Sequence, residues 1–174
     1  MGRRINVKGT SGSGKTTFAQ ELARRLDVPF VELDALHWAS PGWQEPSDGE
    51  FRASVAEAIA PLDGWVIDGN YERKLGDLVI GPADTIVWLD LPLRLKLRRV
   101  WRRTMERMRA DEQLWGGNKE SWRGAFWGRD SLFGWMLRTH LRHRCEWPSL
   151  YGDDPRFVRL RSVREAREWL DANS

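Results

Sequence analysis

The sequence predicts an α/β fold built on a mainly parallel sheet, and three observations lead to this prediction. Short apolar runs alternate along the chain with longer stretches of helical periodicity, which is the order of elements in α/β proteins. Three of the apolar runs end at an aspartate, namely Asp34, Asp68 and Asp90. A glycine-rich turn separates the first strand from the first helix. Because open α/β sheets bind ligands at the carboxyl ends of their strands, we expect a ligand site beside these aspartates.

The strands are predicted from short runs of apolar residues that are bounded by turn residues. Runs of this kind are typical of parallel strands that are covered on both faces. The expected strands cover residues 5–8, 29–33, 65–67, 85–89 and 156–160.

The helices are predicted from apolar residues at helical spacing. Ser47 and Glu50 form a capping box that begins the second helix, and residues 61–64 end it. Pro92 begins a long helix that continues to about Arg109. The other expected helices cover residues 17–26, 120–144 and 163–170, and loops are expected at 37–46 and 110–118.

Composition narrows the class of protein. The chain has 174 residues and a net charge of +3, and its single cysteine excludes an internal disulfide. No apolar run approaches the roughly 20 residues of a membrane span, and the N-terminus leaves no room for a signal peptide, so we expect a cytoplasmic protein without membrane contact. Residues 94–144 hold fourteen Lys or Arg against five Asp or Glu, which concentrates positive charge in one block.

Residues 9–16 match the phosphate-binding pattern G-x-x-x-x-G-K-[ST]. Small residues let successive backbone N–H groups point at phosphate oxygens, Lys15 would reach the β- and γ-phosphates, and the Thr16 hydroxyl would bind Mg²⁺. The expected nucleotide-binding residues of this stretch are Gly9, Thr10, Ser11, Gly12, Ser13, Gly14, Lys15, Thr16 and Thr17.

The order of these motifs resembles the small P-loop kinases related to adenylate, shikimate and gluconate kinases. Residues 66–71, 89–92 and 98–103 are similar to the group of DNA-topology-modulation proteins, also described as "adenylate kinase and related kinases". The resemblance implies a P-loop NTPase fold with three α/β/α layers and five mainly parallel strands, the first of them central. It also implies one domain over residues 1–174, with a helical lid inserted at about 104–146.

The resemblance further implies roles for residues outside the loop. Asp34 resembles the position that contacts Mg²⁺ or the acceptor, and Asp68 resembles the aspartate that orders water around Mg²⁺. Arg99, Arg102 and Arg103 resemble the arginines that clamp the transferring phosphate, and only Glu106 offers an opposite charge between residues 94 and 109. Arg161 and Val163 resemble the loop that packs on adenine.

One stretch departs from the adenylate kinases. They follow Asp-Gly with Phe-Pro-Arg, whereas this chain has Asn70-Tyr71-Glu72-Arg73 after Gly69. The departure argues against an ordinary AMP site.

These observations predict an enzyme, a kinase that uses ATP and Mg²⁺. A small-molecule acceptor is expected, and the sequence leaves open whether it is a nucleotide, a nucleoside or a sugar acid. The alternative is a nucleic-acid-associated NTPase, since the basic block also contains tryptophans on which bases could stack. The oligomeric state is not predicted.

Overall fold

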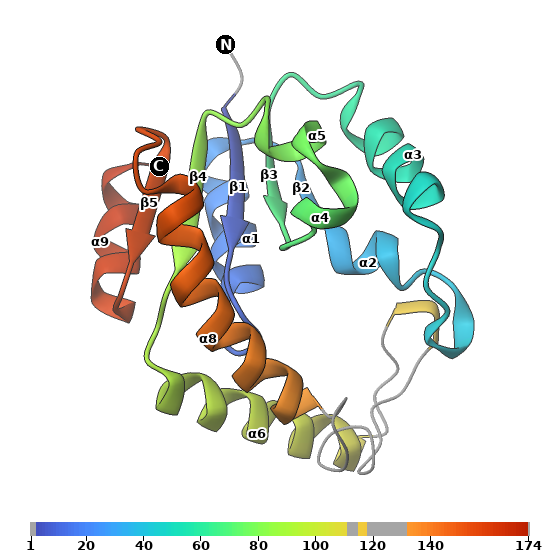
Figure 1. The fold of residues 1–174 in the computed structure, drawn as a ribbon, viewed down its shortest axis with the longest axis vertical. Coiled ribbons are helices and arrows are strands. Elements are labelled where there is room, and N and C mark those ends of the chain that lie inside the picture. The colour runs from blue at the N-terminus through green and yellow to red at the C-terminus, as the bar shows by residue number, and fades with distance from the viewer. Residues whose placement is uncertain (1–2, 111–114, 118–131, 174) are drawn as a thin grey trace.

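The structure is a computed structural model that describes residues 3–110, 115–117 and 132–173 (Figure 1). Five parallel strands form one sheet in the order β2-β3-β1-β4-β5, so the first strand is central as predicted. Their bounds are β1 Arg4–Lys8, β2 Phe30–Glu32, β3 Trp65–Asp68, β4 Thr85–Leu89 and β5 Phe157–Leu160.

Helices cover both faces of this sheet, which gives the predicted three layers (Figure 1). On one face, α1 (Lys15–Leu26) and α9 (Val163–Ala172) pack over Ile5 and Val7 of the central strand. On the other face lie α3 (Asp48–Ile59), α4 (Glu72–Leu75), α5 (Asp77–Ile80) and α8 (Leu132–Tyr151). The buried faces of α1 and α9 show why these stretches form helices, since their apolar residues repeat at helical spacing.

The predicted capping box begins α3. The Ser47 hydroxyl accepts a hydrogen bond from the backbone N–H of Glu50 at 3.2 Å, and the Glu50 carboxylate accepts one from the Ser47 N–H at 2.9 Å. Two N–H groups that the helix itself cannot satisfy therefore have partners.

The second strand is shorter than predicted. It ends at Glu32, and Leu33 begins a short helix, α2 (Leu33–His37), which places Asp34 in a first helical turn instead of at a strand end. The prediction was wrong here because β2 is an edge strand that pairs only with β3. Leu33 instead turns into the core beneath α3. The helices α4 and α5, and the turn η1 (Pro41–Trp43), were also not predicted.

The long helix predicted from Pro92 is α6 (Leu93–Ala110). The helix predicted at 120–144 corresponds in part to α8, which continues to Tyr151, and residues 118–131 lie outside the described residues. Of the lid expected at about 104–146, the structure describes the end of α6, the turn η2 (Trp115–Gly117) and most of α8. Trp122 and Trp127, two tryptophans of the basic block, lie outside the described residues. Among the described helices, none combines the length and apolar character needed to span a bilayer.

Candidate active site

The phosphate loop curls between β1 and α1 as its sequence predicts. Gly12 and Gly14 adopt φ angles of 76° and 85°, a left-handed conformation that favours glycine, and the Ser13 N–H donates to the Thr10 carbonyl at 3.1 Å. A side chain at Gly12 would collide with the backbone of Lys96 on α6. The loop is therefore packed directly against α6, and its shape depends on glycine at this position.

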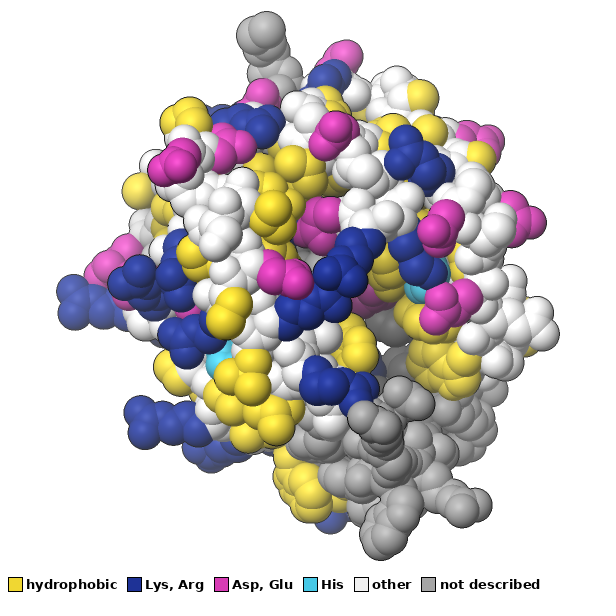
Figure 2. Space-filling model, viewed as in Figure 1, with side chains coloured by type: hydrophobic (Ala, Val, Ile, Leu, Met, Phe, Trp, Pro, Cys, Tyr) yellow, Lys and Arg dark blue, Asp and Glu magenta, His cyan; other side chains and the backbone are white. Residues whose placement is uncertain are grey.

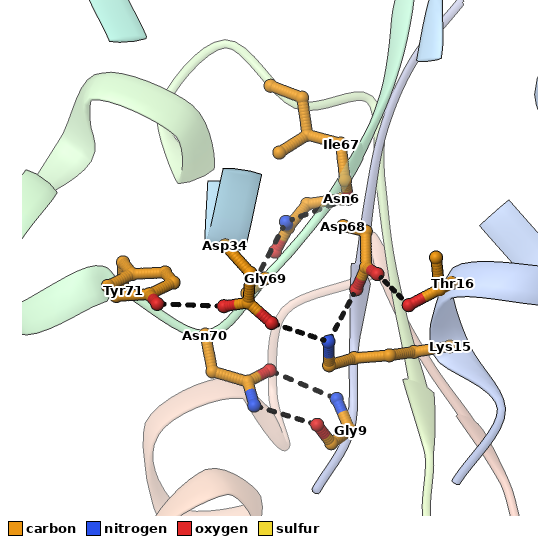
Figure 3. Close-up of polar contacts among 10 residues, drawn as sticks. All are labelled: Asn6, Gly9, Lys15, Thr16, Asp34, Ile67, Asp68, Gly69, Asn70 and Tyr71. Atoms are coloured by element: carbon orange, nitrogen blue, oxygen red, sulfur yellow. Dashed lines mark hydrogen bonds and ion pairs between the residues drawn. The ribbon is translucent and has the colours of Figure 1, made fainter. Parts of the chain in front are cut away.

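Four side chains of the predicted site meet at the carboxyl edge of the sheet (Figure 3). The Lys15 Nζ lies 3.0 Å from Asp68 Oδ1 and 3.7 Å from Asp34 Oδ2. The Thr16 hydroxyl donates to Asp68 Oδ2 at 2.6 Å. Residues from the phosphate loop, the end of β3 and α2 thus form one connected polar cluster.

Charge holds Lys15 in its protonated form. Burial alone would lower its pKa, but the carboxylates of Asp68 and Asp34 outweigh burial, so the pKa of Lys15 lies above its ordinary value. Asp68 is fully buried, and burial raises its pKa against the opposing effects of Lys15 and Thr16. A buried carboxylate of this kind is stabilised by cations, whether an ammonium or a metal.

The oxygens of Thr16 and Asp68 suit a magnesium ion. Both are hard oxygen donors, they lie side by side at the mouth of the loop, and Asp68 Oδ1 is buried with no hydrogen bond besides its ion pair with Lys15. Mg²⁺ in phosphate sites is held by one or two protein oxygens together with phosphates and water. Within the described residues, no group of three or more His, Cys, Asp or Glu could hold a metal by itself.

Asp34 is held by a residue that the sequence did not assign to the site. The Tyr71 hydroxyl donates to Asp34 Oδ1 at 2.7 Å, and the other carboxylate oxygen faces Lys15 (Figure 3). The next residue back along the chain, Asn70, exchanges two hydrogen bonds with the backbone of Gly9, at 3.0 and 2.7 Å. The sequence signal for both was the departure from Phe-Pro-Arg after Asp68-Gly69.

The three predicted arginines of α6 differ in position. Arg99 reaches the phosphate loop, where its Nη1 donates to the Ser13 carbonyl at 3.1 Å. Arg103 lies one turn further along and is half-buried. Arg102 faces solvent with 78% of its side chain exposed and pairs with Glu106 at 3.5 Å. The structure therefore brings Arg99 to the loop and does not bring Arg102 there.

The remaining predicted residues lie next to the phosphate loop and after the last strand, β5. Thr17 is exposed in the first turn of α1. Arg161 lies between β5 and α9, and Val163 is the first residue of α9, which Ser162 caps by accepting from the Glu165 N–H at 3.1 Å. Arg161 is exposed, and its own N–H donates to the Glu165 carboxylate at 2.8 Å.

Two buried lysines beside the loop were missed. Lys96 of α6 is 1% exposed and donates to the Thr10 hydroxyl at 2.8 Å, and its Nζ also lies 2.7 Å from His140 Nδ1 on α8. Burial lowers the pKa of Lys96 to about 8. Its position at helical spacing between Leu93 and Val100 was the available signal, because that spacing places it on the buried face of α6.

Lys8 is the second of these lysines and ends the central strand. It is fully buried, contacts Glu72, and lies 4.6 Å from the ring centroid of Trp147 and 4.9 Å from that of Tyr151, both on α8. Alternation along β1 turns Asn6 and Lys8 away from the core that Ile5 and Val7 join. Alternation along a strand accounts for this direction, but the aromatic surroundings of Lys8 are seen only in the tertiary structure.

The described part of the predicted basic block lies largely on the surface, with these exposed arginines on α6 and α8: Arg94, Arg98, Arg102, Arg138, Arg142 and Arg144. Figure 2 views the face that carries α8, and Lys and Arg side chains gather there around exposed apolar ones. Trp101 of α6 is 52% exposed and Leu141 of α8 is 59% exposed.

Comparison with known proteins identifies proteins that are similar to this chain. Residues 5–67 match the family described as "ATPase family associated with various cellular activities (AAA)". The chain is 25% identical over 170 residues to the uncharacterized protein YqaC of Bacillus subtilis, covering 98% of this chain and 83% of that protein. It is 30% identical over 125 residues to the shikimate kinase of Thermosynechococcus vestitus, covering 64% of this chain and 67% of that enzyme.

Other shikimate kinases are matched over less of their length. The chain spans 64%, 55% and 61% of the enzymes from Geobacter sulfurreducens, Bradyrhizobium diazoefficiens and Halorhodospira halophila. A cytidylate kinase of Pyrobaculum aerophilum is 34% identical over 107 residues, covering 55% of this chain and 58% of that enzyme.

Solved structures share the fold. A gluconokinase from Sinorhizobium meliloti superposes with a TM-score of 0.56 at 23% identity, covering 98% of this chain and 92% of that one. A shikimate kinase from Acinetobacter baumannii in complex with shikimate superposes with a TM-score of 0.57 at 18% identity, covering 99% and 90%. At these identities the likeness concerns the fold.

Proposed function

Because the chain belongs to the small P-loop kinases, we propose that it transfers the γ-phosphoryl group of ATP to a small-molecule acceptor. The observation that carries the proposal is the cluster of Lys15, Thr16, Asp34 and Asp68 at the mouth of the phosphate loop. One cation, one hydroxyl and two carboxylates converge there, and these groups suit phosphate, Mg²⁺ and an acceptor.

Each group has a role in this proposal. The loop N–H groups and Lys15 bind the β- and γ-phosphates and stabilise the charge that shifts during transfer. Thr16 and Asp68 hold Mg²⁺, which when bound neutralises negative charge on the phosphates. Arg161 and Val163 pack beside the adenine. The lid at about 104–146 excludes water when ATP and acceptor are bound.

Asp34 is assigned to the acceptor. Asp34 Oδ2 lies 3.7 Å from Lys15 Nζ, so an acceptor that contacts the Asp34 carboxylate would be close to the γ-phosphate that Lys15 binds. A carboxylate in that place can take the proton of a hydroxyl acceptor or orient a phosphate acceptor. The relatives include enzymes named for shikimate, gluconate and cytidylate, which represent both kinds of acceptor.

The direct test is a screen of ATP turnover against shikimate, gluconate, cytidine monophosphate, nucleosides and single-stranded oligonucleotides, with Mg²⁺ present. We expect one class of small molecule to stimulate ADP release and to appear as a phosphorylated product in the mass spectrum. Turnover stimulated only by the oligonucleotides would instead support the nucleic-acid-associated NTPase. If no compound is phosphorylated and ATP does not bind, the proposed function is wrong.

Replacing Asp68 with asparagine should weaken binding of Mg²⁺-ATP more than binding of metal-free ATP. The change keeps the shape of the side chain and removes the negative charge that attracts a hydrated cation. Calorimetric titration of ATP with Mg²⁺ and with EDTA measures the two affinities. Equal losses under both conditions would assign Asp68 a structural role through Lys15 and Thr16.

Replacing Arg99 and Arg103 together with alanine should lower kcat far more than it weakens ATP binding. Guanidinium groups that meet the phosphoryl oxygens mainly in the transition state contribute to the rate and little to ground-state affinity. Arg102→Ala is the matched control, since that side chain pairs with Glu106 in solvent. Unchanged turnover together with lost oligonucleotide binding in the double variant would favour the nucleic-acid alternative.

A further inference from the structure

The segment that follows β3 connects the two halves of the candidate active site. Three consecutive side chains of this segment each contact a different part of the site. Asn70 contacts Gly9, Tyr71 contacts Asp34, and Glu72 contacts Lys8. These are the residues at which the sequence departs from the adenylate kinases. The adenylate-kinase pattern therefore does not explain why this chain carries them.

Asn70 fixes the entrance of the phosphate loop. Its amide accepts from the Gly9 N–H at 3.0 Å and donates to the Gly9 carbonyl at 2.7 Å (Figure 3). Two hydrogen bonds between one side chain and one residue's backbone define both distance and orientation. These two hydrogen bonds therefore restrict movement of the segment after β3 relative to the phosphate loop.

Tyr71 fixes Asp34. Its hydroxyl donates to Asp34 Oδ1 at 2.7 Å, and its ring is held by Phe51 and His37, with ring centroids 5.0 and 4.9 Å away. Phe51 is 1% exposed and His37 is 3% exposed, so the ring rests against a buried wall. Burial and the Asp34 carboxylate raise the pKa of Tyr71 far above its ordinary value, so the hydroxyl stays a donor across the physiological range.

Glu72 holds the same segment to the central strand. Its carboxylate contacts the buried Lys8, which directly precedes Gly9, and the ring centroids of Trp147 and Tyr151 lie 4.6 and 4.9 Å from Lys8 Nζ. The segment after β3 therefore contacts two successive residues, Lys8 and Gly9, where β1 ends and the phosphate loop begins.

We propose that Asn70 and Tyr71 are a pair of positioning residues that set the distance between the phosphate loop and Asp34. The proposal rests on the proposed kinase function and adds a division of labour to it. Asn70 acts on the ATP side through Gly9, and Tyr71 acts on the acceptor side through Asp34. Because a misplacement of about 1 Å can lower a rate roughly a hundredfold, such a connection between the two sides has a direct effect on transfer.

The experiment is a double-mutant cycle on Tyr71 and Asp34. Tyr71→Phe, Asp34→Ala and the double variant are compared with the unmodified chain in two assays: ATP hydrolysis with water as the acceptor, and transfer to the acceptor found by the screen. Alanine is used at position 34 because, unlike asparagine, it cannot accept the Tyr71 hydrogen bond. Tyr71→Phe should lower the kcat for transfer to the acceptor roughly tenfold or more, which is the usual effect of losing a hydrogen bond to a charged group. It should leave the KM for ATP unchanged. In the Asp34→Ala background the same change should have an effect of less than about twofold.

Tyr151→Phe is the matched control. Tyr151 is the chain's only other tyrosine, and its ring, which the variant retains, stacks on Phe157 and contacts Lys8. This variant should keep the kcat of the unmodified chain. Thermal melting of each variant shows whether the fold persists, and the rates are compared below the lowest transition.

Asn70→Ala tests the other half of the proposal. It should weaken ATP binding several-fold in calorimetry, because the entrance of the loop loses two hydrogen bonds to Gly9. Its kcat at saturating ATP should fall less than that of Tyr71→Phe.

The outcomes separate the inference from the function on which it rests. If the unmodified chain transfers phosphate but Tyr71→Phe is as active, or lowers the rate equally with and without Asp34, the positioning role of Tyr71 is refuted and the kinase function stands. An Asn70→Ala variant with unchanged ATP affinity refutes the role of Asn70. An unmodified chain that neither hydrolyses nor transfers phosphate overturns the proposed function, and the inference with it.

Discussion

Replacing Lys15 with alanine is expected to lower phosphoryl transfer by roughly a hundredfold to a thousandfold or more. The Lys15 ammonium lies between two carboxylates at the mouth of the phosphate loop, and their charge keeps it protonated. ATP would bring phosphate oxygens to this ammonium, so its loss removes a fixed positive charge at the place where negative charge shifts during transfer. Steady-state ADP release with the identified acceptor measures the effect.

The same substitution has a structural consequence that must be measured with it. Asp68 is fully buried and loses its only cationic partner within the described residues, while the hydrogen bond from Thr16 remains. We therefore expect a lower melting temperature as well as a lower rate. Arg164→Ala is a suitable control for loss of a positive charge, because Arg164 is 86% exposed on α9 and pairs with Glu168. A folded Lys15→Ala protein with near-normal turnover would contradict the kinase assignment.

Replacing Asp34 with asparagine is expected to lower turnover by roughly 10²- to 10⁴-fold if the acceptor is a hydroxyl compound, the range typical of a lost general base. The amide keeps an oxygen that can accept from Tyr71, so the geometry changes little while the proton acceptor is removed. ATP affinity should change by much less than the rate, since Asp34 lies 3.7 Å from Lys15 whereas Asp68 lies 3.0 Å away.

The size of the effect distinguishes the two kinds of acceptor. An acceptor that is itself a phosphate needs no strong base, so Asp34→Asn would then raise the KM for the acceptor more than it lowers kcat. Unchanged kinetics with every acceptor would remove Asp34 from the mechanism. Glu45→Gln is a useful comparison, because this carboxylate also lies near α2 but pairs with Lys74 at 2.8 Å.

Much of the fold was accessible from the sequence because local patterns determine it. The strands β1, β3, β4 and β5 and the helices α1, α3, α6 and α9 fall where apolar spacing and the Ser47–Glu50 capping box predicted them, within a few residues. The failures lie where local preference is weak. The three-residue edge strand β2 and the four-residue helices α4 and α5 are too short for a periodic pattern.

The phosphate loop could be predicted from the sequence, because eight consecutive residues contain the glycines, the lysine and the hydroxyl that its backbone and chemistry require. The sequence also predicted that Asp34 and Asp68 lie near one edge of the sheet, although Asp34 is in the first turn of α2 and not at the end of a strand. The packing of the elements was needed to show which arginine of α6 reaches the loop, that Tyr71 donates to Asp34, and that Lys8 and Lys96 are buried beside the loop. The hydrogen bonds of Arg99, Tyr71 and Lys96 join residues 37 to 86 positions apart, and those of Arg99 and Lys96 depend on how α6 lies against the phosphate loop. Spacing along one helix or strand tells which side chains share a face, but the partner of that face is fixed only when the elements pack.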